Sequence, residues 1–400
     1  MGEKVTMGFH SAVDFELKWD ASIIEGLASK YDIRRNELRT DFPVKTERDI
    51  IIAILGHLTE GTGGEYVPET NRLCKEFASH FEYRQTIGGT ATRAAIAISK
   101  LGFRSTLSMC CYNDAIRTFL PEEIHQFPNV KEIDNEIYPH VILSYPGKTR
   151  IQVNDMDIIT PRENRVMFSN DATALNMEVS RDFAAELADA RVFLLGCFSE
   201  VLDFDILKDR MEKTEYLLEN LAPEAWAILE DGCYINKDFR YYVHKKLKKR
   251  LNVLSMNEDE IQEYIGRKID ILDPQSMQEA LQYVYKKIDI PILVVHSAAW
   301  ALAYGVRPEK LEQALHGGIC LSATRFRYGD SFGKEEYKET EELPDKEAGV
   351  RFCREIKDKL GKHIFCLPAK ELSFVENPTV VGLGDFFAGG LLPGMLHTSP

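Results

Sequence analysis

Short apolar runs alternate with amphipathic stretches through the second half of the chain. Each run has the length of a β-strand, and the stretches between them, such as residues 204–219 and 276–288, repeat their apolar positions at helical spacing. The apolar runs are residues 192–196, 225–230, 251–256 and 290–296. This alternation predicts an α/β fold with a doubly wound, mostly parallel sheet and helices on both faces.

The first half has a less regular pattern. Residues 5–13 are apolar and predict a first core strand, which places Asp14 at its C-terminal end, the edge where open α/β sheets bind ligands. Residues 141–153 alternate around Pro146-Gly147 and predict a hairpin. Hairpins are unusual inside a doubly wound sheet. We therefore assign this one to an accessory sheet that could act as a lid.

A chain of 400 residues fits one large core with a smaller attachment. We expect one large, discontinuous α/β domain with its main body at about residues 91–135 and 180–400 and its first strand at residues 5–14. The lid is expected to consist of segments within about residues 15–90 and 136–175.

Two glycine-dense turns each lead into a helix of small residues. The first contains Gly88 and Gly89 and opens a helix over residues 92–100, and the second contains Gly382 and Gly384. Glycine tolerates positive φ and lets backbone amides approach an anion, and a helix N-terminus adds partial positive charge. The two turns therefore predict two ligand-binding helix starts, one for each of two substrates.

Asp385 directly follows the second turn. A carboxylate placed where amides bind phosphate can take the proton of an attacking hydroxyl, which is the role that a kinase needs filled. A turn of this kind can also join a strand to a helix without any chemistry. The upstream motifs favour phosphoryl transfer.

Two of the predicted strands end in acidic residues. Glu230 closes one strand, and Asn257 and Glu260, three residues apart, begin the helix after the next. Carboxylates with an amide on one helix face suit Mg²⁺ and its waters. Helix capping by Asn257 and favourable interaction of the acids with the helix dipole account for the same residues without a metal. Both interpretations remain open at this point.

Three further positions carry candidate chemistry. Asp14 can accept hydrogen bonds from vicinal sugar hydroxyls, although a turn or capping aspartate fits the same position. Glu65 lies in a glycine-rich loop at residues 60–65, which could be a ligand loop or a connection. Arg162 and Arg165 follow Pro161 and could clamp a phosphate group, whereas surface ion pairing explains them equally well.

Composition limits the class of protein. With 44% hydrophobic and 28% charged residues, the chain is an ordinary globular protein. Its net charge of −14 argues against nucleic-acid or membrane partners, and no apolar run approaches the roughly 20 residues of a membrane span. Eight cysteines without a Cys-x-x-Cys pair or a preceding signal peptide predict reduced, mostly buried thiols in a cytoplasmic protein.

Together these motifs resemble the ribokinase-like superfamily and, within it, the ADP-dependent glucokinase and phosphofructokinase family. The most family-specific match is the Pro-Arg-Glu-Asn-Arg stretch at residues 161–165, and the similarity spans Gly8 to Gly390. The superfamily's motifs come in the expected order: Asp14, Gly88-Gly89, Asn257-x-x-Glu260 and Gly382-x-Gly384-Asp385. The resemblance implies a lid that closes over a large α/β domain, with Mg·ADP as the phosphoryl donor and a sugar as the acceptor.

The resemblance also implies roles for single residues. Asp385 would be the base, and Arg165, or alternatively Arg162, would stabilise the transferring group. Glu230 and Glu260 would organise Mg²⁺. The nucleotide would meet Asn257, Val381, Gly382, Leu383 and Gly384, of which Gly382 and Gly384 belong to the anion hole, and the sugar would meet Asp14, Glu65, Gly88 and Gly89.

Three departures from the family pattern concern the metal and the sugar. Ile228 stands where the family's His-x-Glu motif has histidine, Thr90 stands where the glucokinases usually have glutamine, and Thr92 replaces a glycine. Glu65 favours a neutral sugar, so we expect glucose or a related hexose more than fructose 6-phosphate. The alternatives are an ATP-dependent carbohydrate or nucleoside kinase and a non-catalytic regulatory protein that binds sugar or nucleotide. We expect a monomer or a small homo-oligomer.

Overall fold

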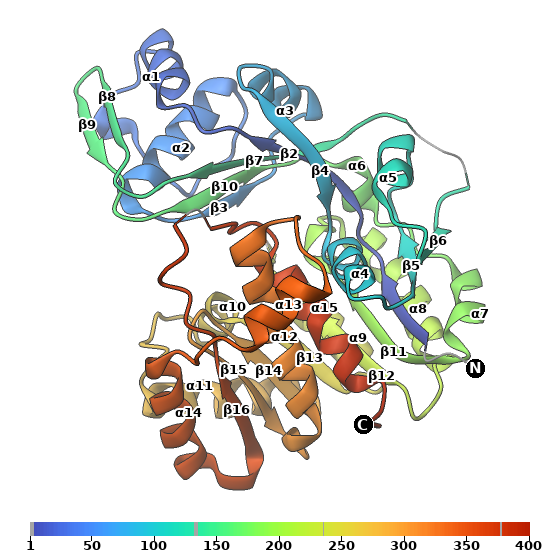
Figure 1. Cartoon of the computed structure of the whole chain (residues 1–400). Helices are drawn as coiled ribbons and strands as arrows, with labels where there is room; N and C mark the ends of the chain where they lie inside the picture. The colour runs from blue at the N-terminus through green and yellow to red at the C-terminus, as the bar shows by residue number, and fades with distance from the viewer. Residues whose placement is uncertain (1–3, 132–134, 235, 377) are drawn as a thin grey trace.

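Two β-sheets organise the chain in the computed structural model, which describes residues 4–131, 135–234, 236–376 and 378–400 (Figure 1). The large sheet has nine strands in the order β16-β15-β14-β13-β12-β11-β1-β5-β6. The small sheet has five strands in the order β3-β10-β7-β2-β4. A separate two-stranded ribbon consists of β8 (Arg150–Val153) and β9 (Met156–Ile159).

The large sheet is parallel from β6 to β14 and antiparallel at the edge formed by β15 and β16. It contains the four strands that the second half of the sequence predicted, so the doubly wound α/β expectation is confirmed. Its strands are β1 (Lys4–Gly8), β5 (Ser105–Met109), β6 (Ile124–Pro128), β11 (Ala190–Gly196), β12 (Trp226–Glu230), β13 (Val253–Asn257), β14 (Ile292–His296), β15 (Trp300–Gly305) and β16 (Ile364–Pro368).

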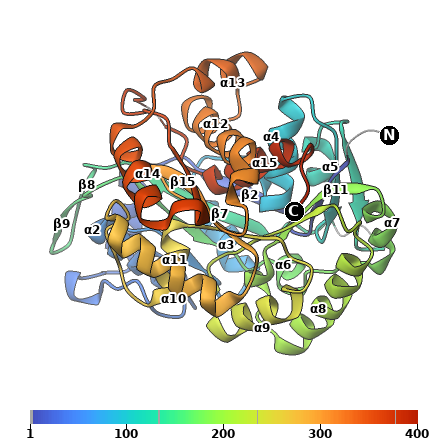
Figure 2. The ribbon, with the colours of Figure 1, turned by 90° about the horizontal axis from the view of Figure 1, so that it is seen from below.

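Neighbouring residues of the central strands pack into different cores. In β11, Val192 and Leu194 belong to one buried cluster, whereas Phe193 and Leu195 belong to another. One face of the sheet carries α4 (Thr90–Lys100), α12 (Glu312–Tyr328) and α15 (Leu383–Met395). The opposite face carries α8 (Phe204–Glu219), α9 (Lys237–Leu247), α10 (Glu258–Ile265), α11 (Pro274–Ile288) and α14 (Glu347–Leu360), as Figure 2 shows from below.

Shorter helices complete the body. They are α5 (Asp114–Phe119), α6 (Ala172–Asn176), α7 (Ala184–Leu187) and α13 (Lys334–Glu341). Among the described residues, no helix combines the length and the apolar character that a membrane span needs. All eight cysteines are unbridged and five of them are buried, which agrees with the prediction of mostly buried thiols.

The small sheet lies at one end of the molecule with three helices on its outer side (Figure 1). The longest of these helices begins at a capping box that Thr46 and Asp49 form. The strands are β2 (Ala12–Leu17), β3 (Gly64–Tyr66), β4 (Tyr83–Gly88), β7 (Pro139–Tyr145) and β10 (Asn164–Phe168), and the helices are α1 (Ala21–Lys30), α2 (Glu47–Glu60) and α3 (Asn71–Ala78).

Two expectations for the first half are wrong. Residues 5–13 do not form one strand, because β1 ends at Gly8 in the large sheet and β2 begins at Ala12 in the small one. Asp14 therefore lies inside β2 and not at the end of a core strand. Residues 141–153 do not form a hairpin, since β7 pairs with β2 and β10 while β8 pairs with β9. An apolar pattern marks a strand but does not reveal its partner, which tertiary burial decides.

Candidate active site

The start of α15 is an open helix N-terminus. Gly382 caps it at φ 77°, and its carbonyl accepts a hydrogen bond of 3.0 Å from the Phe386 amide. The amides of the first turn, including those of Leu383 and Gly384, have no acceptor within a helix and so face outward. A Cβ at residue 382 would lie 2.4 Å from Nη1 of Arg93, so both the backbone angle and the neighbouring guanidinium require glycine.

Asp385 is held in place by two residues of α4. The Thr90 hydroxyl donates a hydrogen bond of 2.8 Å to Oδ1, and Nε of Arg93 lies 3.7 Å from Oδ2. The Asp385 side chain keeps 24% of its surface exposed, so a substrate can reach it. The two glycine-led helix starts that the sequence predicted thus meet at one carboxylate. Asn377, the first residue of the motif stretch, lies outside the described residues.

Arg93 is the centre of a buried charge network. It is 5% exposed, its Nη2 donates to Oδ2 of Asp14 at 2.5 Å, and the same nitrogen lies 3.5 Å from Oε1 of Glu16. Burial by itself lowers the pKa of Arg93, but Asp14 and Asp385 outweigh it and raise the pKa above its ordinary value. Arg93 therefore stays charged and joins the small sheet to α15.

Sequence reasoning did not single out Arg93. The available signal was an arginine within a helix of small, buried residues directly after Gly88-Gly89. Asp14, which was expected to face the sugar, is 3% exposed and bonded to this arginine. Asp14 thus supports Arg93, and its contact with the sugar stays a prediction.

Gly88 makes room for this pair. A Cβ at residue 88 would lie 2.1 Å from Oδ1 of Asp14. We expect Gly88→Ala to lower the free energy of unfolding by about 1–3 kcal/mol, as overpacking of a core does, measured by urea denaturation. The matched control is Gly26→Ala in α1, where a Cβ meets nothing within 4 Å and a small gain is expected. Equal effects of the two changes would contradict this explanation.

The small sheet contributes an ion pair to the same region. Nη2 of Arg165 on β10 donates to Oε1 of Glu65 on β3 at 2.9 Å. Burial opposes the charge of Arg165, but Glu65 and Asp385 raise its pKa above the ordinary value. Asp385 is therefore within electrostatic reach of Arg165. Arg162 instead donates from Nε to the Gly61 carbonyl at 2.8 Å, within the glycine-rich loop.

The acidic strand ends come together as expected from a parallel sheet. Asn257 and Glu260 form a reciprocal capping box at the start of α10, so their structural interpretation is confirmed. Burial, followed by Asp231 and Glu230, raises the pKa of Glu260 well above its ordinary value. Oε2 of Glu230 is buried without a hydrogen-bond partner. A carboxylate oxygen without a partner beside a second acid fits the preference of Mg²⁺ for oxygen ligands.

His296 is a further polar residue at this edge that sequence reasoning missed. It ends β14, its ring stacks on Phe387 with centroids 4.1 Å apart, and its Nε2 lies 4.0 Å from Oε1 of Glu230. Ile228, which replaces the family's histidine, is fully buried in the core. The signal in the sequence was a histidine that ends an apolar strand. An imidazole from the neighbouring part of the sheet thus lies beside Glu230 without a hydrogen bond to it.

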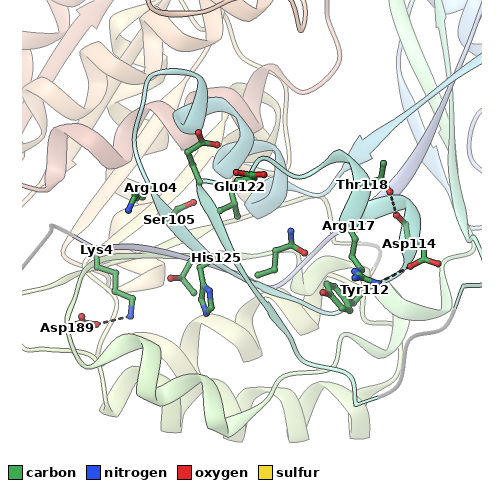
Figure 3. A pocket seen from close by; sticks show the side chains of 14 residues that line it. Lys4, Arg104, Ser105, Tyr112, Asp114, Arg117, Thr118, Glu122, His125 and Asp189 are labelled. Atoms are coloured by element: carbon green, nitrogen blue, oxygen red, sulfur yellow. Dashed lines mark hydrogen bonds and ion pairs between the residues drawn. The ribbon is translucent and has the colours of Figure 1, made fainter.

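A pocket of about 1190 Å³ lies elsewhere, against β5, β6 and α5 (Figure 3). Its lining includes Arg104 and His125, and it pairs charges internally, since Lys4 bonds to Asp189. None of the residues that line it is a candidate site residue. This pocket therefore lies apart from the candidate active site around Asp385.

The profile of one protein family, the ADP-specific phosphofructokinase/glucokinase conserved region, matches residues 3–312. The chain belongs to this family. It is an ADP-dependent sugar kinase with the fold of the ribokinase-like proteins. The profile match ends before α15 and does not include Asp385. No curated protein matched the sequence.

Solved structures show the shared fold of this kinase. A phosphofructokinase from Pyrococcus horikoshii OT3 with AMP superposes with a TM-score of 0.75 at 15% identity, covering 98% of each chain. An ADP-dependent kinase in complex with fructose-6-phosphate and ADPβS gives 0.78 at 13% identity, covering 98% of this chain and 93% of the other. The last common ancestor of the Methanosarcinales ADP-dependent phosphofructokinases gives 0.70 at 15% identity, covering 100% and 94%.

Proposed function

We propose that this kinase transfers the β-phosphate of Mg·ADP to a hydroxyl group of a neutral hexose of the glucose type, giving a hexose phosphate and AMP. The observation that carries the proposal is the Asp385 carboxylate, which Thr90 and Arg93 hold at the open N-terminus of α15. Fructose 6-phosphate is the second candidate acceptor, because a structural relative was solved as a complex with it.

Asp385 acts as the general base. The hydrogen bond from Thr90 fixes Oδ1, and the Arg93 guanidinium lies beside Oδ2. The sugar hydroxyl gives its proton to this carboxylate as its oxygen bonds to the β-phosphorus, and the bond from that phosphorus to the leaving AMP oxygen breaks. Positioning and charge stabilisation supply most of the acceleration in phosphoryl transfer.

The phosphate oxygens meet positive groups from the large domain and from the small sheet. The amides of Gly382, Leu383 and Gly384 and the dipole of α15 bind them from the body. Arg165 adds a guanidinium from the small sheet. We prefer it to Arg162 because Asp385 is close enough to help raise the pKa of Arg165. Glu230 and Glu260 would hold Mg²⁺ and its waters, and the nucleotide would meet Asn257 and Val381. When bound, Mg²⁺ neutralises charge on the phosphate groups.

The small sheet acts as the lid. It carries Arg165 and Glu65 toward the site, while Gly88 and Gly89 mark the point where the chain crosses from β4 into α4. Gly89 adopts φ 90° and a Cβ there would lie 2.5 Å from the His10 carbonyl, so this crossing accepts glycine alone. Closure would exclude water, so that the sugar hydroxyl attacks the phosphate in place of water.

The charges on the sugar side favour a neutral sugar. Burial raises the pKa of Glu200 to about 7, with His140 opposing the shift and Glu65 and Asp171 adding to it. Burial raises the pKa of the Cys197 thiol, and the charges of Glu200 and Asp385 add to this rise. The same thiol lies 3.7 Å from the Thr90 hydroxyl. A group of carboxyl side chains therefore lies next to the catalytic carboxylate. A sugar that carries its own phosphate would be repelled there.

We expect Glu65→Gln to raise the KM for glucose by roughly tenfold or more, because a hydrogen bond to a charged group contributes about 1.5–3 kcal/mol. Discrimination against fructose 6-phosphate should weaken at the same time. The matched control is Glu69→Gln, an exposed acid four residues away. The assay combines ADP or ATP with glucose, fructose 6-phosphate and other sugars. Preference of the unchanged enzyme for fructose 6-phosphate would refute the choice of sugar.

A further inference from the structure

Three polar side chains gather in the body beside the junction of the two sheets. His10 comes from the connection between β1 and β2, His140 is the second residue of β7, and Asp171 caps α6. They are 4%, 4% and 3% exposed. One potential ligand atom from each residue lies within 4.8 Å of the others. Three elements that are far apart in sequence thus bring two imidazoles and a carboxylate to one buried point.

One ring nitrogen in this cluster lacks the partner that a buried polar atom usually has. Nε2 of His10 is buried without a hydrogen-bond partner, whereas Nε2 of His140 is buried with Asp171 at ion-pair distance. Oδ1 of Asp171 accepts hydrogen bonds from Thr173 and Ala174 at the start of α6. The other oxygen, Oδ2, lies 3.3 Å from Nε2 of His140. The cluster therefore presents two nitrogens and one oxygen that the helix cap does not use.

We propose that His10, His140 and Asp171 bind a transition-metal ion of the Zn²⁺ class at a site separate from the Mg²⁺ carboxylates. Two imidazoles with one carboxylate form a donor set that Zn²⁺, Co²⁺ and Fe²⁺ accept, whereas Mg²⁺ prefers oxygen alone. Metal–ligand bonds of about 2.0–2.2 Å place tetrahedral ligands about 3.3–3.6 Å apart. The His140–Asp171 separation already matches, and rotation of the unbonded His10 ring brings in the third ligand.

The surroundings orient His140 for this role. Its Nδ1 lies 3.9 Å from Oδ1 of Asp14, which has no hydrogen-bond partner. A carboxylate behind the far nitrogen of a ligating histidine fixes the tautomer that leaves Nε2 for the metal. Because Asp14 also bonds to Arg93, the metal would stiffen the junction on which the catalytic network rests. The site thus holds the lid strands β2 and β7 to the body and makes no direct contact with the reacting groups.

The test uses the full chain, stripped of metal with a chelator and dialysed, and then titrated with Co²⁺ alone. We expect one equivalent of bound Co²⁺ with the visible absorption of a low-coordinate ion, displaced by Zn²⁺ and not by excess Mg²⁺. His10→Gln and Asp171→Asn should each weaken Co²⁺ binding by at least about 100-fold. Asparagine at residue 171 preserves helix capping, so this variant separates metal binding from folding. The matched control is His125→Gln, an exposed histidine on β6.

Two results would overturn the proposal. One is an absence of tightly bound Co²⁺ and Zn²⁺ from the unchanged protein. The other is equal Co²⁺ affinity in the unchanged protein, His10→Gln and Asp171→Asn, which would place the ion on other groups such as the cysteines. Circular dichroism of each variant shows that it is folded, so a loss of binding in the folded state is distinguishable from unfolding.

Discussion

Replacement of Asp385 by asparagine should reduce kcat by at least about 100-fold, as removal of a general base does, with little change in the free energy of unfolding. The amide oxygen can still accept the hydrogen bond from Thr90, but it cannot take the proton of the sugar hydroxyl. The measurement is the rate of AMP formation at saturating ADP and sugar, together with urea denaturation.

The matched control for this change is Asp203→Asn at the start of α8. Asp203 also lies at a helix N-terminus, where it accepts hydrogen bonds from two backbone amides and asparagine can replace it. We expect this variant to keep the activity of the unchanged enzyme. An Asp385→Asn enzyme with more than about a third of the original kcat would remove Asp385 from the mechanism.

Arg93→Met should cause the largest loss of stability, about 3–5 kcal/mol in the free energy of unfolding, because it leaves Asp14 as a buried charge without its guanidinium partner. Activity should fall as well, since Asp385 loses its neighbouring cation. The double variant Arg93→Met with Asp14→Asn should recover part of the stability, which a double-mutant cycle in urea measures.

An exposed ion pair provides the control for Arg93. Arg72 pairs with Glu76 on the surface of α3, with 83% and 53% of the two side chains exposed. Arg72→Met should change stability by no more than about 0.5 kcal/mol. If Arg93→Met were equally mild, the buried network would not be the support that the structure indicates.

Much of the large sheet could be predicted from sequence because its strands are buried on both faces and its helices are amphipathic. The predicted helix at residues 204–219 matches α8 residue for residue. Glu230 at the end of β12 and Glu260 after β13 were placed at the correct edge for the same reason, since parallel strands end at a common edge. Local periodicity was sufficient for these elements.

The remaining features depend on which elements meet in space. Nothing local to residues 8–12 shows that the chain leaves one sheet for another, and the Pro146-Gly147 turn has the same pattern whether or not its flanking strands pair. Thr90 and Arg93 contact Asp385 across almost 300 residues of sequence, at a separation of 295 positions for Thr90. Such contacts come from the packing of α4 against α15, which a single sequence does not specify.

The most direct test of the account is to incubate the enzyme with Mg²⁺, glucose and ADP labelled in its β-phosphate. The proposed reaction predicts that the label appears in hexose phosphate while AMP accumulates in equal amount, and that Asp385→Asn slows both by at least about 100-fold. Release of the label as inorganic phosphate, or no transfer to any sugar, would contradict the assignment of this site as an ADP-dependent sugar kinase centre. Transfer to fructose 6-phosphate alone would keep the chemistry and contradict the neutral acceptor.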